Sequence, residues 1–372
     1  MTTDTSTPGI GFLLRVIVKA VALFAVCNFA TILLPDALLS TASVYNTLVP
    51  GRERFPFSNA SQSDNNVTIS NLDVLFGSHI IYSAARDDDE YRVFLLGDSA
   101  MWGFNLVAAD QYATHINAQN PATPDEQPVR VYNLAYPGTS AAKDLLILEY
   151  AMRYSPDLVI WMVTPTGLTH EEQISHDITR SNPNFARTVF DNYRLDLEPD
   201  YITTTLWERT LYGQREQLFR LLRLQLYAGT WAGIGFDHRI PDTYPTPTND
   251  FDDDLRWRDR DPGHNLLDQW DMDVVRAVMN RTSPDMILIN EPVYRADGEN
   301  SDLHYNSYLP RWVNDTYRET MAALATENDW TYYDWWDAVP PSEFIDPLHV
   351  KPDGAQQVSD MLLDVILENA ED

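Results

Sequence analysis

Cysteine is almost absent from this chain of 372 residues, which contains only Cys27. A single cysteine excludes an intrachain disulfide and also excludes a cluster of metal-binding thiolates. The stability of the folded chain must therefore come from packing. A hydrophobic content of 44%, with 12% aromatic residues, can fill the core of one large domain or of two ordinary ones.

Basic residues are scarce as well. The chain has 26 Lys and Arg against 55 Asp and Glu, which gives a formal net charge of -29. Proteins that bind nucleic acid need Lys and Arg to displace counterions from the phosphates, so we expect no nucleic-acid partner. The charge balance favours a solvated surface outside the cell or in concentrated salt.

One segment near the N-terminus is almost wholly apolar and is interrupted by Arg15 and Lys19 on its N-terminal side. A helix needs about 20 apolar residues to cross a bilayer, and the two cations can reach the headgroups. Because such cations favour the cytoplasmic side, we predict a cytoplasmic tail over residues 1–8, a single membrane anchor over 9–35 and an extracytoplasmic remainder.

A cleaved signal peptide is the alternative interpretation of this segment. Ser40-Thr41-Ala42 resembles a small-residue cleavage site before Ser43. Residues 36–68 carry Pro, Asn, Ser and Asp without a clear period, which indicates a spacer between the membrane and the folded domain.

From Tyr91 the chain alternates between apolar runs and helical periodicity. We predict strands over 91–96, 129–134 and 158–163, with helices over 110–119 and 140–154 between them. Such alternation predicts a parallel sheet covered by helices on both faces, a three-layer α/β/α sandwich. The functional site is then expected at the carboxyl ends of the strands.

The alternation of strands and helices ends at about residue 167. We predict that residues 168–282 form a mainly helical insertion or cap. A helix over 206–227 carries a leucine stripe, and it either shapes a substrate cleft or belongs to a solvated lid packed by its leucines. The predicted domain thus consists of residues 69–167 and 283–372. In its second part we expect a strand over 286–289, a helix over 309–326, a strand over 330–333 and a last helix after Pro352.

The candidate nucleophile is Ser99, in the stretch VFLLGDSAMWG over Val93–Gly103. A buried strand that ends in Gly-Asp-Ser delivers the serine to an exposed turn, which Asp98 shapes. A serine hydroxyl is a weak nucleophile and needs a base, an acid that orients the base, and donors for an oxyanion. The C-terminal Asp-Pro-Leu-His segment offers His349 as the base and Asp346 as the acid.

These two segments resemble the SGNH (GDSL-type) hydrolase family, whose first block is G-D-S at a strand end and whose last is D-x-x-H before the final helix. The resemblance covers roughly residues 90–167 and 283–372 and is that of a divergent, membrane-anchored member. It implies an SGNH/flavodoxin-like fold in which His349 takes the proton of Ser99, while Asp346 holds the histidine tautomer and stabilises the imidazolium.

The resemblance also implies an oxyanion hole formed by the backbone N–H groups of Ser99 and Gly138 and by an Asn of the third block, G-x-N-D. Here the third block reads Thr-Pro-Thr-Gly, so that Thr166 stands where the Asn is expected. A threonine hydroxyl can donate, but it is shorter than an amide. Because losing one such donor costs about 2.7 to 4 kcal/mol of transition-state stabilisation, we expect a slower enzyme rather than an inactive one.

The function implied by the resemblance is that of a serine esterase or acyltransferase. It would act on ester groups, O-acetyl groups included, of an extracytoplasmic glycan or lipid through a Ser99 acyl-enzyme. The rival hypothesis is a catalytically weak glycan-binding or envelope-assembly protein that keeps the fold. A membrane protein partner stays open, because nothing in the sequence identifies one.

We expect neither a cofactor nor a metal. His170 and His176 lack the spacing of a helical H-E-x-x-H zinc site. The run Asp250, Asp252, Asp254 matches the start of a calcium loop, but a leucine stands where the sharp turn needs glycine. A solvated acidic run is the preferred interpretation.

Overall fold

The computed structural model describes residues 9–33, 52–57, 71–84, 90–202, 205–216 and 269–370, with a few isolated positions between 218 and 247. Several predicted features lie outside these residues. They are the cytoplasmic tail, most of the spacer, the cleavage site at Ser40–Ala42 and the acidic run at Asp250–Asp254.

Five parallel strands form one sheet in the order β2-β1-β3-β4-β5. This is a flavodoxin-like order, in which the chain switches direction of winding between β1 and β3. The predicted three-layer α/β/α sandwich with a parallel sheet is confirmed. The strands are β1 (Tyr91–Leu96), β2 (Val129–Asn133), β3 (Leu158–Val163), β4 (Asp285–Asn290) and β5 (Thr331–Asp334).

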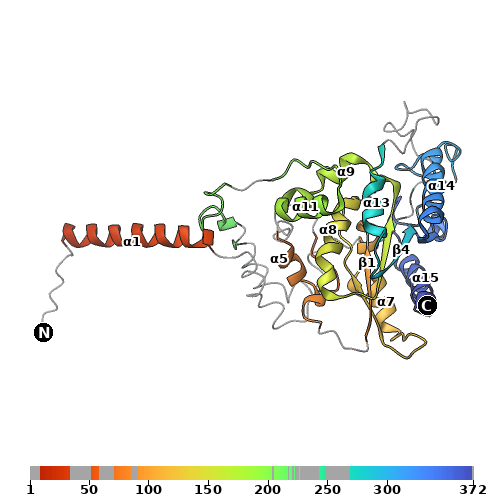
Figure 1. Cartoon of the computed structure of the whole chain (residues 1–372), viewed down its shortest axis with the longest axis horizontal. Helices are drawn as coiled ribbons and strands as arrows, with labels where there is room; N and C mark the ends of the chain where they lie inside the picture. Colours follow the sequence, from red (N-terminus) through yellow and green to blue (C-terminus); the bar gives the residue numbers. More distant parts are fainter. Residues whose placement is uncertain are drawn as a thin grey trace.

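Both faces of the sheet are buried, which explains the unbroken apolar run of β3. Val93 and Leu95 of β1 pack on one face with the helices α7 and α15, and Phe94 and Leu96 pack on the other with α8, α13 and α14 (Figure 1). These helices are α7 (Tyr112–Ala118), α8 (Ala141–Ala151), α13 (Met272–Met279), α14 (Arg311–Asn328) and α15 (Pro352–Asn369). A short helix, α5 (Leu72–Gly77), precedes the first strand.

The described ends of the predicted insertion pack on the core. Three short helices contact α8, namely α9 (His170–Ser175), α10 (Asp177–Ser181) and α11 (Pro183–Tyr193). At the other end, α13 also contacts α8. Both flanks of the insertion thus cover the same helix, and the exact domain boundaries stay predictions.

The predicted helix over 206–227 begins later than its sequence indicates. Residues 206–214 form turns, and helical residues start at Arg215. The hydroxyl of Thr210 donates to the carbonyl of Trp207 at 2.6 Å and accepts the N–H of Gly213 at 3.1 Å. Such local bonding by a threonine competes with the helical backbone pattern. Leu222 and Leu226 are exposed, so these two leucines do not pack on the core.

The N-terminal helix α1 (Ile10–Ala30) projects from the body (Figure 1). With the 3-10 turn Thr31–Leu33 it forms a helical stretch of 24 residues that contains an 18-residue window with a mean hydropathy of 2.3. This stretch is long and apolar enough to cross a membrane. A signal sequence near an N-terminus passes the same test of length and hydropathy.

Candidate active site

The end of strand β1 places Ser99 at the first position of the short helix α6 (Ser99–Trp102). Gly97 precedes it with a φ of 152°, and a Cβ there would lie 2.9 Å from the carbonyl oxygen of Met162. Asp98 caps the helix, because its Oδ1 accepts the N–H of Ala100 at 2.8 Å. The sharp turn therefore depends on a glycine and a capping carboxylate.

His349 and Asp346 meet Ser99 at this turn, although both lie far from it in the sequence. His349 Nε2 is 2.9 Å from Ser99 Oγ, and the other ring nitrogen, Nδ1, is 2.7 Å from Asp346 Oδ2. The histidine thus bridges a hydroxyl and a carboxylate, the arrangement that moves a proton from the hydroxyl to the imidazole. The ring of Phe104 lies 4.8 Å from that of His349, centroid to centroid.

The carboxylate of Asp346 is held by its own turn. Its Oδ1 accepts the N–H groups of Leu348 at 3.0 Å and of His349 at 2.8 Å. Burial by itself would raise the pKa of Asp346, but the hydrogen bond and charge of His349 and these two N–H groups together lower the pKa below its usual value. Asp346 therefore stays ionised and can orient the imidazole.

The loop after β2 brings Gly138 to the same edge of the sheet. Gly138 has a φ of 97°, and a Cβ at this position would lie 2.7 Å from Nε2 of His176. His176 Nδ1 accepts the N–H of Ile178 at 3.2 Å, which assigns the ring proton to Nε2, and Nε2 lies 3.2 Å from the carbonyl oxygen of Pro137. Burial, with the nearby charge of Lys143, lowers the pKa of His176 to about 3, so the ring is neutral.

The loop after β3 places Thr166 at the carboxyl end of the strand next to β1. The hydroxyl of Thr166 lies 2.8 Å from that of Thr164, and either can be the donor. Gln173 holds this loop against the start of α8: its Nε2 donates to the carbonyl of Gly167 at 2.6 Å, and its Oε1 accepts the N–H of Ala142 at 2.7 Å. The Thr166 side chain is therefore engaged rather than free.

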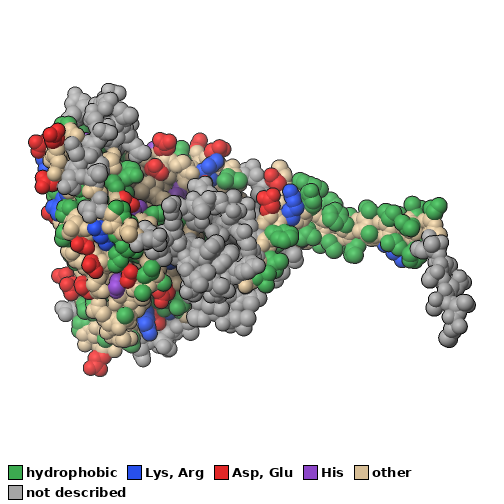
Figure 2. Space-filling view, turned by 180° about the vertical axis from the view of Figure 1, so that it is seen from behind, with side chains coloured by type: hydrophobic (Ala, Val, Ile, Leu, Met, Phe, Trp, Pro, Cys, Tyr) green, Lys and Arg blue, Asp and Glu red, His purple; other side chains and the backbone are tan. Residues whose placement is uncertain are grey.

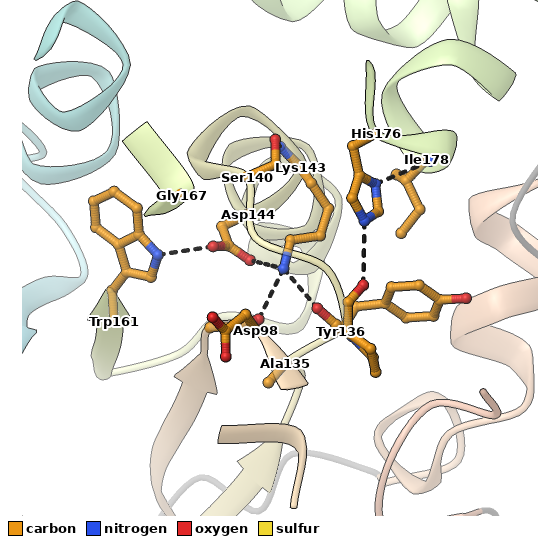
Figure 3. A network of polar contacts seen from close by, with 12 residues as sticks. Asp98, Ala135, Tyr136, Ser140, Lys143, Asp144, Trp161, Gly167, His176 and Ile178 are labelled. Atoms are coloured by element: carbon orange, nitrogen blue, oxygen red, sulfur yellow. Dashed lines mark hydrogen bonds and ion pairs between the residues drawn. The ribbon is translucent and has the colours of Figure 1, made fainter. Parts of the chain in front are cut away.

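A buried lysine lies behind the nucleophile turn (Figure 3). Lys143 Nζ donates to the carbonyl of Gly97 at 2.9 Å and to that of Tyr136 at 2.6 Å, and it forms an ion pair with Asp144 Oδ1 at 2.8 Å. Trp161 Nε1 donates to the other oxygen of Asp144 at 3.0 Å. These contacts join the ends of β1 and β2 to β3. Burial raises the pKa of Asp144 to about 6 even though Lys143 opposes the shift.

Glu291 is buried directly after β4. Within the part of the chain that the structure describes, neither of its carboxylate oxygens has a hydrogen-bond partner. Burial, with the charges of Asp98 and Asp144, raises its pKa well above the usual value in spite of Lys143. A raised pKa is expected here, because the charged form of a buried carboxylate is costly.

Sequence reasoning identified Ser99, His349, Asp346, Gly138 and Thr166, and the structure places all five at the carboxyl-end edge of the sheet or in the loop before α15. It missed the supporting residues Gln173, His176, Lys143, Asp144 and Glu291. His176 lies between the short helices α9 and α10, and Lys143 falls inside a predicted helix. No motif marks these positions, because their roles depend on burial.

Metal-binding groups are not found in the described ranges: no three His, Cys, Asp or Glu side chains there lie close enough to hold an ion. His170 Nδ1 lies 2.9 Å from Asp271 Oδ2 instead. That pair links the start of α9 to the residue before α13.

Comparison with known proteins finds no matching family model and no matching curated protein. Among solved structures, the chain is similar to a carbohydrate acetylesterase family member from Sinorhizobium meliloti, with 14% identity, a TM-score of 0.35, and coverage of 74% of this chain and 99% of that one. It is similar to the aryl esterase of M. smegmatis, with 13% identity, a TM-score of 0.35, and coverage of 74% and 98%.

A third similar structure is an acetylxylan esterase from Geobacillus stearothermophilus, with 13% identity, a TM-score of 0.35, and coverage of 74% of this chain and 94% of that one. At these identities and TM-scores the likenesses carry no argument about activity or substrate.

Proposed function

We propose that this protein is a serine esterase or acyltransferase. The observation that carries the proposal is the hydrogen-bonded series from Ser99 Oγ to His349 Nε2 at 2.9 Å and from His349 Nδ1 to Asp346 Oδ2 at 2.7 Å. Geometry of this kind, rather than sequence position, identifies a catalytic triad.

In the proposed reaction, Ser99 Oγ attacks the ester carbonyl carbon while its proton passes to His349 Nε2. The carbonyl π electrons move to oxygen, and the tetrahedral intermediate collapses when His349 returns the proton to the leaving alcohol. Ser99 then carries the acyl group. A water or an acceptor hydroxyl, deprotonated by His349, attacks this acyl-enzyme and releases the serine with its proton restored.

The oxyanion that forms in each step would be stabilised by the backbone N–H groups of Ser99 and Gly138 and by the hydroxyl of Thr166. If Thr164 donates in the pair of hydroxyls, Thr166 keeps its own proton for the oxyanion. Lys143 supports this arrangement indirectly. Its Nζ donates to the carbonyl of Gly97, just before Ser99, and to the carbonyl of Tyr136, just before Gly138.

For the substrate we propose an O-acetylated glycan outside the cytoplasm, with a lipid ester as the alternative. The support is the apolar helix α1, taken as an anchor that holds the catalytic domain on the extracytoplasmic side. A catalytically weak glycan-binding or assembly protein is the second candidate, and Thr166 in place of the expected Asn is the observation that favours it.

A fluorophosphonate probe tests the nucleophile in the full-length protein in detergent. Wild type should be labelled, and Ser99→Ala should not. Hydrolysis of p-nitrophenyl acetate should fall by nearly the same factor in Ser99→Ala, His349→Ala and the double variant, because the two groups act as a unit. Equal labelling of wild type and Ser99→Ala would contradict the proposal, and labelling without turnover would favour the second candidate.

The two substrate classes separate in one further assay. Wild type should release acetate from an O-acetylated polysaccharide, with Ser99→Ala as the matched control. Release of fatty acid from phospholipid without release of acetate would instead assign the lipid ester.

A further inference from the structure

Residues 205–216 lie against the C-terminal end of α1, in green in Figure 1. Asn28 of α1 makes the contact, because its side-chain oxygen accepts the N–H of Tyr212 at 2.8 Å and its carbonyl accepts the N–H of Leu211 at 3.4 Å. Arg209 also donates to the carbonyl of Ile32 at 3.4 Å. If α1 spans a bilayer, this segment lies at the bilayer surface, where the helix ends.

The segment satisfies many of its own polar groups. Thr205 and Glu208 form a reciprocal capping box, in which Glu208 Oε2 accepts the N–H of Thr205 at 2.6 Å and Thr205 Oγ1 accepts the N–H of Glu208 at 3.3 Å. The side chain of Arg215 donates to the carbonyl of Tyr212 at 2.8 Å. The fold of the segment is therefore built from local polar bonds and leaves its apolar side chains outside.

Those apolar side chains are unusually exposed. Leu206 is 70% exposed and Trp207 60%, and the ring centroids of Trp207 and Tyr212 lie 5.8 Å apart. Farther along the chain, Phe219 is 74% exposed. Single exposed hydrophobic residues need no explanation, but a cluster of them marks an interaction surface.

The segment itself carries no net charge, because Arg209 and Arg215 balance Glu208 and Glu216, in a chain that is otherwise strongly acidic. Residues 206–227 contain four arginines and two glutamates, whereas the whole chain has a net charge of -29. In Figure 2 the green rod of α1 meets the body at a place where blue and red side chains gather. Tryptophan and tyrosine prefer the bilayer–water interface, and arginines attract anionic headgroups.

We propose that the segment 205–216, continued by the exposed Phe219, docks on the lipid surface around α1. Trp207 and Tyr212 lie at the level of the headgroups, and Arg209 and Arg215 face anionic lipid. The proposal goes beyond the esterase activity and rests only on the anchoring role of α1. This contact gives the catalytic domain a second attachment to the membrane, which restricts the orientation of the domain relative to α1.

The test uses full-length protein in nanodiscs of phosphatidylcholine and phosphatidylglycerol. Cys27→Ser removes the only native cysteine. Into this background we place a single cysteine by Trp207→Cys, or by Leu206→Cys as a second position, and label it with an environment-sensitive fluorophore. Leu303→Cys is the matched control, because Leu303 is 60% exposed and lies between β4 and α14.

The label at position 206 or 207 should shift its emission to the blue and be quenched several-fold more strongly by spin-labelled lipid than the label at 303. Equal emission and quenching at all positions would overturn the proposal while leaving the anchor intact. A chain that fails to co-elute with the nanodiscs would overturn the anchor and the proposal together. A blue shift that grows with protein concentration, without lipid quenching, would overturn it in favour of a second copy of the chain.

Discussion

At the scale of single residues, Thr166 is the position where the two functional hypotheses diverge. Its hydroxyl lies 2.8 Å from that of Thr164, and either of the two hydroxyls can be the donor. An oxyanion donor acts mainly in the transition state, and its loss therefore lowers turnover without weakening substrate binding. The effect on kcat compared with the effect on KM therefore distinguishes an oxyanion donor from a residue that only lines the site.

We expect Thr166→Val to lower kcat and kcat/KM of p-nitrophenyl acetate hydrolysis by a similar factor, of about 100- to 1,000-fold. The change deletes the hydroxyl and keeps the β-branched shape. Thr166→Asn should hold or raise the rate. Thr164→Val is the control, because it removes the same hydroxyl pair without removing the proposed donor. If Thr166→Val has the activity of wild type while Ser99→Ala is inactive, the oxyanion is stabilised by the backbone N–H groups of Ser99 and Gly138 alone.

The residues that sequence reasoning could identify are those whose chemistry is local. The turns of Gly-Asp-Ser and Asp-x-x-His are formed by hydrogen bonds within each motif or to the next residue. Asp98 accepts the N–H of Ala100, and Asp346 accepts the N–H of His349. Lys143 and Glu291 could not be found in this way. A lysine in a helix normally faces solvent, and only the three-dimensional packing reveals that this one is buried.

At the scale of elements, the strand boundaries followed from the sequence with little error. Parallel strands that are buried on both faces appear in a sequence as continuous apolar runs. The bounds of β1 and β3 are the same as those predicted. Helix α8 was harder. The sequence predicted a helix over 140–154 but not its burial: almost every residue of α8 is buried, because α9, α10, α11 and α13 all contact it.

The buried pair of Lys143 and Asp144 links three of these elements, and breaking it should affect both stability and rate. Lys143→Met leaves Asp144 buried without its partner and should lower the free energy of unfolding by about 3 to 5 kcal/mol. Lys143→Met with Asp144→Asn removes both charges and should recover most of that loss, while Asn can still accept from Trp161.

Urea denaturation measures the stability of the two variants, and steady-state kinetics measures their rates. We expect kcat to stay low in the double variant with KM little changed, because the carbonyls of Gly97 and Tyr136 have lost their shared donor. A double variant that regains both stability and wild-type kcat would assign the pair a purely structural role.

At the scale of the whole molecule, the direction of α1 decides where the active site operates. Arg15 and Lys19 lie near the N-terminal end of α1, and the folded body lies beyond its C-terminal end. The positive-inside rule therefore predicts that the body is exported.

A reporter enzyme that is active only outside the cytoplasm should therefore work when it is fused after Asp372. The full-length protein should stay in the membrane fraction after a high-salt wash, which releases proteins held only by charge. Appearance of a shortened chain that begins near Ser43 would show a cleaved signal peptide instead.

The hydrogen bond between Ser99 and His349 spans 250 positions, and it joins the end of β1 to a loop that follows β5. During synthesis the chain emerges from its N-terminus, so β1 and the serine turn are complete long before the histidine exists. A growing or truncated chain thus carries a nucleophile with no base. The order of synthesis therefore keeps the proposed chemistry silent until the loop before α15 has been made.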